Sequence, residues 1–175
     1  PPTGTGAEYS NQDGDLDIMT NLTILGAGAD TTIIQAGTLG YPDAGANGID
    51  GVFQISNILY GAPALNVTIT GVTIANGRNT LSGSGGAIAL LGESHLTLAN
   101  VVFSGNDAAG VGGAIFAFGG TINIDNSTFS NNRSLYGGAL YIQSRNTTAF
   151  LTITDSSFVS NLATNINGGG ALAIS

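Results

Sequence analysis

Short segments in which apolar and polar residues alternate recur along the chain from residue 51 onward. An alternation with a period of two is typical of a β-strand that buries one face, and none of the segments has a helical period. We therefore expect an all-β chain with almost no helix. The first segment of a repeat follows a glycine pair at Gly85-Gly86-Ala87-Ile88, Gly112-Gly113-Ala114-Ile115, Gly137-Gly138-Ala139-Leu140 and Gly169-Gly170-Ala171-Leu172.

The later segments of each repeat keep a constant spacing. The start of the second and the end of the third stand seven residues apart, at Val67 and Ile74, Leu96 and Phe103, Ile122 and Phe129, and Leu151 and Phe158. Self-similarity at a spacing of about 20–50 residues is the signature of stacked repeats. Three short strands joined by tight turns form one coil of a parallel β-helix. We predict a right-handed parallel β-helix (solenoid) of about five coils with three strands per coil, because parallel crossovers are right-handed as a rule.

Stacked coils are expected to align their equivalent side chains in ladders. The predicted ladders are an aliphatic column of Ile88, Ile115, Leu140 and Leu172, a buried aromatic column of Phe103, Phe129 and Phe158, and a corner column of Asn106, Asn132 and Asn161. Asparagine tolerates the left-handed backbone conformation, so we expect the corner asparagines to adopt it and to hydrogen-bond from coil to coil. The glycine pairs are expected to supply positive φ at another corner.

The chain is the size of one domain, and we interpret residues 1–175 as a single β-helix domain. Residues 1–12 form an irregular leading segment, residues 13–50 a looser first coil with a protruding loop, and residues 51–175 the regular coils. Residues 168–175 begin a fresh coil and stop, which predicts an open C-terminal edge. We expect another copy, or flanking coils of a longer protein, to cover that edge.

Composition narrows the possible partners. Three arginines and no lysine stand against eleven acids, and the net charge of −8 argues against nucleic acid or anionic lipid. Cysteine is absent, which excludes disulfides and cysteine zinc sites and is compatible with an exported bacterial protein. No apolar run approaches the roughly 20 residues of a membrane helix, so we expect no membrane insertion of this segment.

The paired Gly-Gly-Ala-Ile/Leu and Phe-x-x-Asn motifs of residues 85–172 resemble the repeats of chlamydial polymorphic membrane proteins, which are autotransporter passengers with a right-handed β-helix. The opening stretches Gly14-Asp15-Leu16-Asp17-Ile18 and Asn21-Leu22-Thr23-Ile24 are similar to the N-terminal coils of bacterial CSLREA-type secreted proteins, although the signature that names that group is absent. These resemblances imply export and surface display, and they bring no catalytic residue with them.

We therefore predict a non-enzymatic extracellular β-helix with a structural or adhesive role, either a surface-displayed passenger or a subunit of a cell-surface filament assembled by end-to-end coil stacking. Its expected partners are other copies or flanking coils at the open ends, together with host or cell-surface glycans or proteins. The alternatives are a carbohydrate-active enzyme of the lyase or hydrolase kind and, after it, an ice-binding protein.

An enzyme of the lyase kind needs a basic residue beside calcium-binding carboxylates. The three arginines, Arg78, Arg133 and Arg145, fall in or near turns without an acidic cluster. A hydrolase needs two carboxylates a few ångströms apart. Asp125 and Asp155 are expected at equivalent positions of successive coils, but turn formation explains both, so we predict no catalytic residue and no cofactor.

Asp13, Asp15 and Asp17 form the densest acidic segment and the single calcium candidate. This segment lacks the glycine and the glutamate of an EF-hand, and a solvated acidic turn is the preferred interpretation. His95 has no second histidine or cysteine with which to bind a transition metal.

Threonine dominates the outward positions of the second segment, which are Thr23, Thr68, Thr97, Asn123 and Thr152. A flat file of threonines is the kind of surface that an ice-binding protein uses, but Asn123 interrupts it. Threonine is also a good strand former, which explains the file without a ligand.

Overall fold

The computed structural model of the chain describes residues 15–36, 51–56, 63–79, 83–144 and 149–175. All regular structure in these residues is β-strand. The strands form four sheets, and each pair of neighbouring strands runs parallel. The chain is therefore a parallel β-solenoid, as its periodicity predicts.

Each sheet collects one strand from every turn. The first sheet contains β1 (Leu16–Ile18), β4 (Phe53–Ser56), β8 (Ile88–Leu91), β12 (Ile115–Phe118), β16 (Leu140–Gln143) and β20 (Leu172–Ile174). The second contains β2 (Leu22–Leu25), β5 (Asn66–Thr70), β9 (His95–Ala99), β13 (Thr121–Asp125) and β17 (Phe150–Thr154). The third contains β3 (Ile33–Gln35), β6 (Thr73–Ala75), β10 (Val102–Ser104), β14 (Thr128–Ser130) and β18 (Ser157–Val159). The fourth contains β7 (Arg78–Asn79), β11 (Asp107–Ala108), β15 (Arg133–Ser134) and β19 (Leu162–Ala163).

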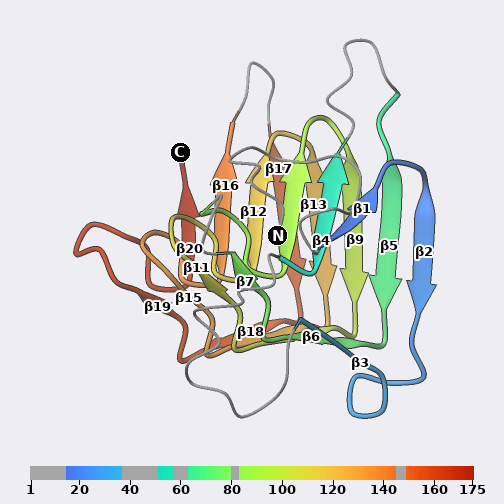
Figure 1. Cartoon of the computed structure of the whole chain (residues 1–175), viewed down its shortest axis with the longest axis horizontal. Coiled ribbons are helices and arrows are strands. Elements are labelled where there is room, and N and C mark those ends of the chain that lie inside the picture. The colour runs from blue at the N-terminus through green and yellow to red at the C-terminus, as the bar shows by residue number, and fades with distance from the viewer. Residues whose placement is uncertain (1–14, 37–50, 57–62, 80–82, 145–148) are drawn as a thin grey trace, which may run out of the picture.

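The chain visits the four sheets in the same order in each turn, and the turns stack along the long axis of the molecule (Figure 1). Four complete turns follow a first turn with three described strands, and β20 begins another. We predicted about five coils of three strands, whereas each complete turn has a fourth strand of two residues. A strand of two residues is too short to show the alternation on which the prediction depends.

The core runs through the middle of the solenoid and consists of the inward residues of the first three sheets. In β9 the burial alternates, so that Leu96 and Leu98 are fully buried while His95 is exposed and Thr97 is half-buried. Burial of such aliphatic side chains stabilises the fold by roughly 1.5–3 kcal/mol each. Strands this short hold together because each adds one inward layer to the same continuous core.

The glycine pairs occupy the corner that leads into the first sheet. The first glycine of a pair has positive φ, with values of 71° at Gly85, 62° at Gly112 and 60° at Gly137. The second glycine lies against the backbone of the next coil. A Cβ atom on Gly138 would lie within 3.0 Å of the carbonyl oxygen of Gly170, so the two backbones can approach only because the side chain is absent.

The coil formed by residues 149–175 uses the same inward positions but leaves them less covered. None of its residues is buried, and Leu151, Ile153 and Phe158 are only half-buried. The equivalent residues of the preceding coil, Ile122, Ile124 and Phe129, are at most 1% exposed. Complete burial of a coil therefore requires a coil on each side of it.

Candidate functional site

The aromatic column lies in the third sheet, where strand pairing puts Phe103, Phe129 and Phe158 directly over one another. Neighbouring ring centroids are 4.7 Å apart, with interplanar angles of 7° for the first pair and 4° for the second. This stacking distance follows from the spacing of parallel strands, which is about 4.8 Å. Phe103 and Phe129 are fully buried, so the column is part of the core and offers no surface to a ligand.

The aliphatic column lies in the first sheet. Ile88, Ile115, Leu140 and Leu172 pair in register from β8 to β20. The first three are fully buried, and Leu172 on the last strand is half-buried. This column also has a packing role.

The asparagine column forms a continuous hydrogen-bonded chain at the corner between the third and fourth sheets. Backbone N–H groups of Gly77, Asn106 and Asn132 donate to the Oδ1 atoms of Asn106, Asn132 and Asn161, at 2.9, 3.0 and 3.0 Å. The Nδ2 groups of Asn106 and Asn132 donate to the Oδ1 of the next asparagine at 3.0 and 2.9 Å. All three Nδ2 groups also donate to a backbone carbonyl of the preceding coil, at 2.8–3.1 Å. Buried amides therefore connect the coils.

The predicted left-handed conformation of these three asparagines is wrong. Positive φ occurs one residue earlier, at Gly105, Asn131 and Ser160. The left-handed residue turns the chain, and the asparagine that follows it directs its amide inward, where Asn106 and Asn132 are fully buried. This corner therefore needs two different residues: one that adopts positive φ at the turn, and an asparagine after it whose amide points inward.

Sequence reasoning missed a row of serines near the start of the third sheet. The Oγ atom of Ser127 accepts a hydrogen bond from the backbone N–H of Val101 at 3.1 Å, and the Oγ atom of Ser156 accepts one from Ser127 at 3.0 Å. Each serine also donates to a carbonyl two residues earlier. The available signal was a serine two residues before Phe129 and again before Phe158.

Asp125 and Asp155 do not occupy equivalent positions, which corrects the expected carboxylate pair. Asp125 is the last residue of β13 and pairs with Thr154, whose Oγ1 donates to Asp125 Oδ1 at 2.7 Å. Asp155 is the next residue along and has a positive φ of 46°, like the turn residues Asn100 and Asn126 of the two preceding coils. Both aspartates are exposed, and they therefore have turn and strand-end roles in different columns.

The calcium candidate is only partly described, because Asp13 lies outside the described residues. Asp15 precedes β1, and Asp17 within β1 accepts a hydrogen bond from Gln54 Nε2 at 3.1 Å. Within the described ranges no three His, Cys, Asp or Glu side chains gather closely enough to hold a metal ion. His95 is exposed on β9 and lies in register between Asn66 and Thr121.

The outward threonine file of the second sheet is in register from β2 to β17. Asn123 interrupts it, and the adjacent file runs Leu25, Thr70, Ala99, Asp125 and Thr154. Only two of the five strands, β5 and the edge strand β17, have threonine in both files, and they are not neighbours, so the regular hydroxyl lattice of an ice-binding face is not formed.

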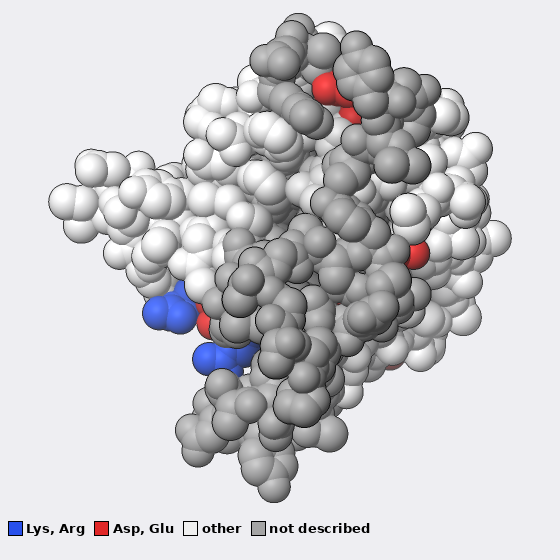
Figure 2. Space-filling view, turned by 45° about the horizontal axis from the view of Figure 1, so that its top comes forward, with Lys and Arg blue, Asp and Glu red and all other residues white. Residues whose placement is uncertain are grey.

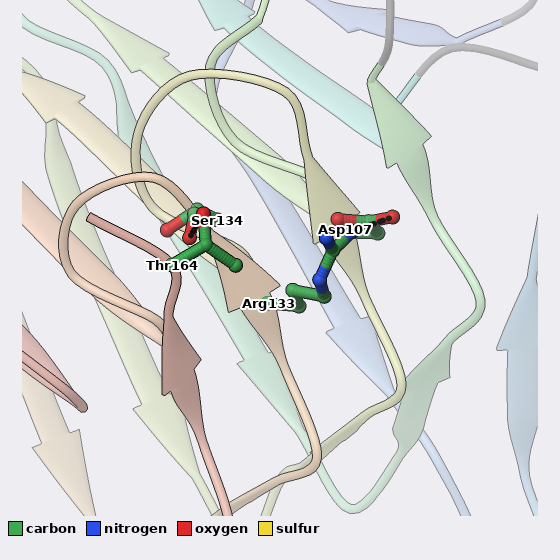
Figure 3. A network of polar contacts seen from close by, with 4 residues as sticks. All are labelled: Asp107, Arg133, Ser134 and Thr164. Carbon is green, nitrogen blue, oxygen red and sulfur yellow. Dashed lines mark hydrogen bonds and ion pairs between the residues drawn. The ribbon is translucent and has the colours of Figure 1, made fainter.

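The arginines have a more specific arrangement than the sequence predicted. Arg78 and Arg133 lie on strands β7 and β15, and Asp107 of β11 pairs in register with both. Figure 3 shows the side chain of Arg133 directed toward Asp107, with Nη1 3.5 Å from Oδ2. We expected no acidic cluster near the arginines, and the structure places a single carboxylate, that of Asp107, beside Arg133. Arg145 lies outside the described residues.

Residues 19–175 match the family model described as a right handed beta helix region. The chain belongs to the right-handed β-helix family. A stretch of 83 residues is also 40% identical to the probable autotransporter YfaL of Escherichia coli strain K12. That match covers 41% of this chain and 7% of YfaL, so the chain spans a small part of its relative's length. No solved structure matches the chain.

In this member of the β-helix family the inward side chains fill the solenoid, so chemistry with other molecules must take place on the outer faces or at the ends of the stack. Figure 2 shows that the described surface on one side is mostly uncharged, with a few acidic groups and one place where basic and acidic atoms meet. The described part of the chain has no helix that is long and apolar enough to cross a membrane.

Proposed function

We propose that this β-helix is an extracellular, non-enzymatic structural segment of a bacterial surface protein, displayed as a passenger or built into a cell-surface filament. The partial similarity to a probable autotransporter supports surface display. The resemblance of residues 85–172 to chlamydial polymorphic membrane protein repeats, and of the opening coil to CSLREA-type proteins, belongs to the same proposal. So does the assignment of residues 1–175 to one domain.

The observation that carries the structural role is the coil-to-coil asparagine chain together with the stacked phenylalanines. Their side chains join successive coils and contribute nothing to the outer surface, since Asn106, Asn132, Phe103 and Phe129 are fully buried. The repeated residues of the chain therefore serve the extension of a rod. A rod is what a displayed stalk or a filament needs.

The competing function is a carbohydrate-active enzyme, since β-helix chains also occur in enzymes. We propose the non-enzymatic role because Asp125 and Asp155 fall in different columns and because the described acids form no cluster of three. A turnover screen on acidic and neutral polysaccharides, with and without calcium, tests this. Turnover that Asp125→Asn or Asp155→Asn abolishes would reverse the assignment.

We further propose that the ends of the solenoid pair with other coils, which are either flanking coils of the same protein or coils of another copy. At one end Leu151, Ile153 and Phe158 are half-buried, and at the other end so are Ile24 and Ile34. When two copies stack head to tail, the apolar residues at the end of one copy would pack on those at the start of the next, in the columns of the second and third sheets. The same stacking would pair the exposed edges of β17 and β18 with β2 and β3, and that of β20 with β4, because β20 takes the place of β1 in the first sheet.

Gly170 gives this stacking a specific test. A Cβ atom on Gly86, Gly113 or Gly138 would lie within 3.0 Å of the carbonyl oxygen of the equivalent glycine in the next coil, whereas a Cβ atom on Gly170 has nothing within 4 Å. An added coil would put its own carbonyl oxygen in that space. None of these four glycines has positive φ, so a substitution tests the space alone.

We expect the purified chain to form head-to-tail filaments that are visible by negative-stain electron microscopy. Gly170→Val should leave the melting temperature unchanged and give dispersed monomers. The matched variant Gly138→Val should lower the melting temperature, because the clash falls inside the stack. Dispersed monomers of the unaltered chain at high concentration would remove self-assembly from the proposal and leave flanking coils as the partner.

A further inference from the structure

The described residues contain two basic side chains, Arg78 and Arg133, and both lie in one outward file of the fourth sheet. Strand pairing orders this file as Arg78, Asp107, Arg133 and Leu162, from β7 to β19. The residues that follow them in each strand, Asn79, Ala108 and Ser134, are buried, so the file is on the outer side of the sheet. We call Arg78, Asp107 and Arg133 the arginine file.

The single carboxylate of the arginine file does not satisfy both guanidinium groups. Asp107 pairs with Arg133 at 3.5 Å, and no ion pair joins it to Arg78. The Nε atom of Arg78 is buried and has no hydrogen-bond partner in the described structure. A guanidinium offers five donors in a planar fork, and the described structure uses one donor of Arg133. Apart from that donor and the buried Nε of Arg78, the donors of both arginines remain for a ligand.

The acidic residues of the chain are concentrated in its first fifty residues. Seven of the eleven acids, and none of the basic residues, lie within residues 1–50. Residues 51–175 contain four acids and three arginines, which leaves a net charge of −1 for the regular coils. The arginine file, with its net charge of +1, is therefore the cationic part of almost neutral regular coils.

The spacing of the file suits an extended anionic chain. Neighbouring strands are about 4.8 Å apart, so the backbones of Arg78 and Arg133 are separated by about 10 Å along the rod. Leu162, which continues the file next to Arg133, is 52% exposed, and Leu135, two residues after Arg133 in the chain, is 43% exposed. Aliphatic side chains beside guanidinium groups can cover the apolar face of a sugar ring while the arginines bind its carboxylate. Two cations are few for a nucleic acid, whose binding depends on many phosphate contacts.

We propose that the arginine file is a binding site for the carboxylate groups of an acidic polysaccharide. The proposal names a ligand class for the adhesive role. It rests on the proposed function, because an extracellular segment is one that would encounter such a polysaccharide. Arg78 and Arg133 bind successive carboxylates along the ligand, and Asp107 keeps Arg133 in position while competing for it. Binding is expected to weaken as salt rises, because both contacts are charge-assisted and partly exposed.

Isothermal titration calorimetry of the full chain with polygalacturonate at low salt tests the site, with dextran as the uncharged polymer. We expect binding to polygalacturonate and none to dextran. Arg133→Gln and Arg78→Gln should each raise the dissociation constant about tenfold or more, as the loss of a hydrogen bond to a charged group does. Asp107→Asn should lower it, because Arg133 then loses its competing partner.

Arg145→Gln is the matched control, since it removes the same charge from a position that the sequence places between β16 and β17. It should leave the dissociation constant within about twofold of the original. Absence of binding to polygalacturonate, or equal weakening by Arg145→Gln and Arg133→Gln, would overturn the site. So would equally tight binding of double-stranded DNA, which would indicate attraction of any polyanion. None of these results bears on end-to-end stacking, which the Gly170→Val filaments test separately.

Discussion

At the scale of single residues, buried asparagine amides hold neighbouring coils together by hydrogen bonds, as apolar side chains of a globular core do by packing. The Oδ1 atom of Asn132 accepts from both the backbone N–H and the Nδ2 group of Asn106, and its own Nδ2 group donates to Phe103 and Asn161. Because Asn132 is fully buried, water cannot replace these bonds. Each asparagine thus fixes the register of two neighbouring coils.

Asn132→Ala is expected to lower the free energy of unfolding by about 3 kcal/mol or more. The change leaves the backbone N–H of Asn106 and one of the two N–H bonds of its Nδ2 group without partners in a dry interior, while the other still donates to Ile74. Each buried unsatisfied donor costs about 1–3 kcal/mol. Chemical denaturation followed by circular dichroism measures the loss. Asn161→Ala is the control, since Asn161 is only half-buried on the last described turn and should cost less. Equal losses for the two variants would show that burial does not set the contribution of the amide.

Conformational detail at this scale could be predicted only in part. Asn-rich corners favour positive φ, but the chemistry of asparagine does not decide which of two adjacent residues adopts it. At Asn131-Asn132 the first residue is left-handed with a φ of 55° and the second supplies the buried amide. The arginine file was not predicted either, because Arg133 and Asp107 are 26 residues apart in the chain and meet only when the coil register is known.

At the scale of the strand, register turns a repeated residue into a continuous column. The first three strands of each coil could be predicted because they alternate and because a fixed offset links the second strand to the phenylalanine of the third. The fourth strand could not be, since Asp107–Ala108 and its equivalents are two residues long. The offset is also what places Phe129 between Phe103 and Phe158, with a ring on each side of it.

Phe129→Ala should therefore be among the most destabilising changes in a strand. Truncation of a fully buried phenylalanine costs about 3–5 kcal/mol through lost transfer energy and the cavity that remains. Phe158→Ala removes the same atoms from a half-buried position and from one stacking contact instead of two, so its cost should be clearly smaller. Urea denaturation of both variants measures the difference. A larger loss for Phe158→Ala would mean that the terminal coil is covered in solution.

At the scale of the whole molecule, a solenoid has contacts only between neighbouring coils, so its stability is graded along the axis. Inner coils are covered on both sides, and β18 has a neighbouring strand on one side only. Local opening is easiest where few buried contacts must be broken. The rod should therefore open from its ends, and anything that covers an end should protect the coil beneath it.

Hydrogen exchange measured by mass spectrometry can detect both effects in one experiment. At low protein concentration we expect the amides of β9 to β14 to exchange more slowly than those of β17 to β19, because the inner strands open only with the whole stack. If coils of separate copies stack on the terminal coil, the protection of β17 to β19 should rise with protein concentration. Gly170→Val should remove that rise and leave the inner strands unchanged, because its side chain would occupy the space of the incoming carbonyl oxygen. Uniform protection from β9 to β19 that does not depend on protein concentration would contradict the graded stability. It would require that the solenoid opens as a single cooperative unit, with the end coil as well covered as the middle coils.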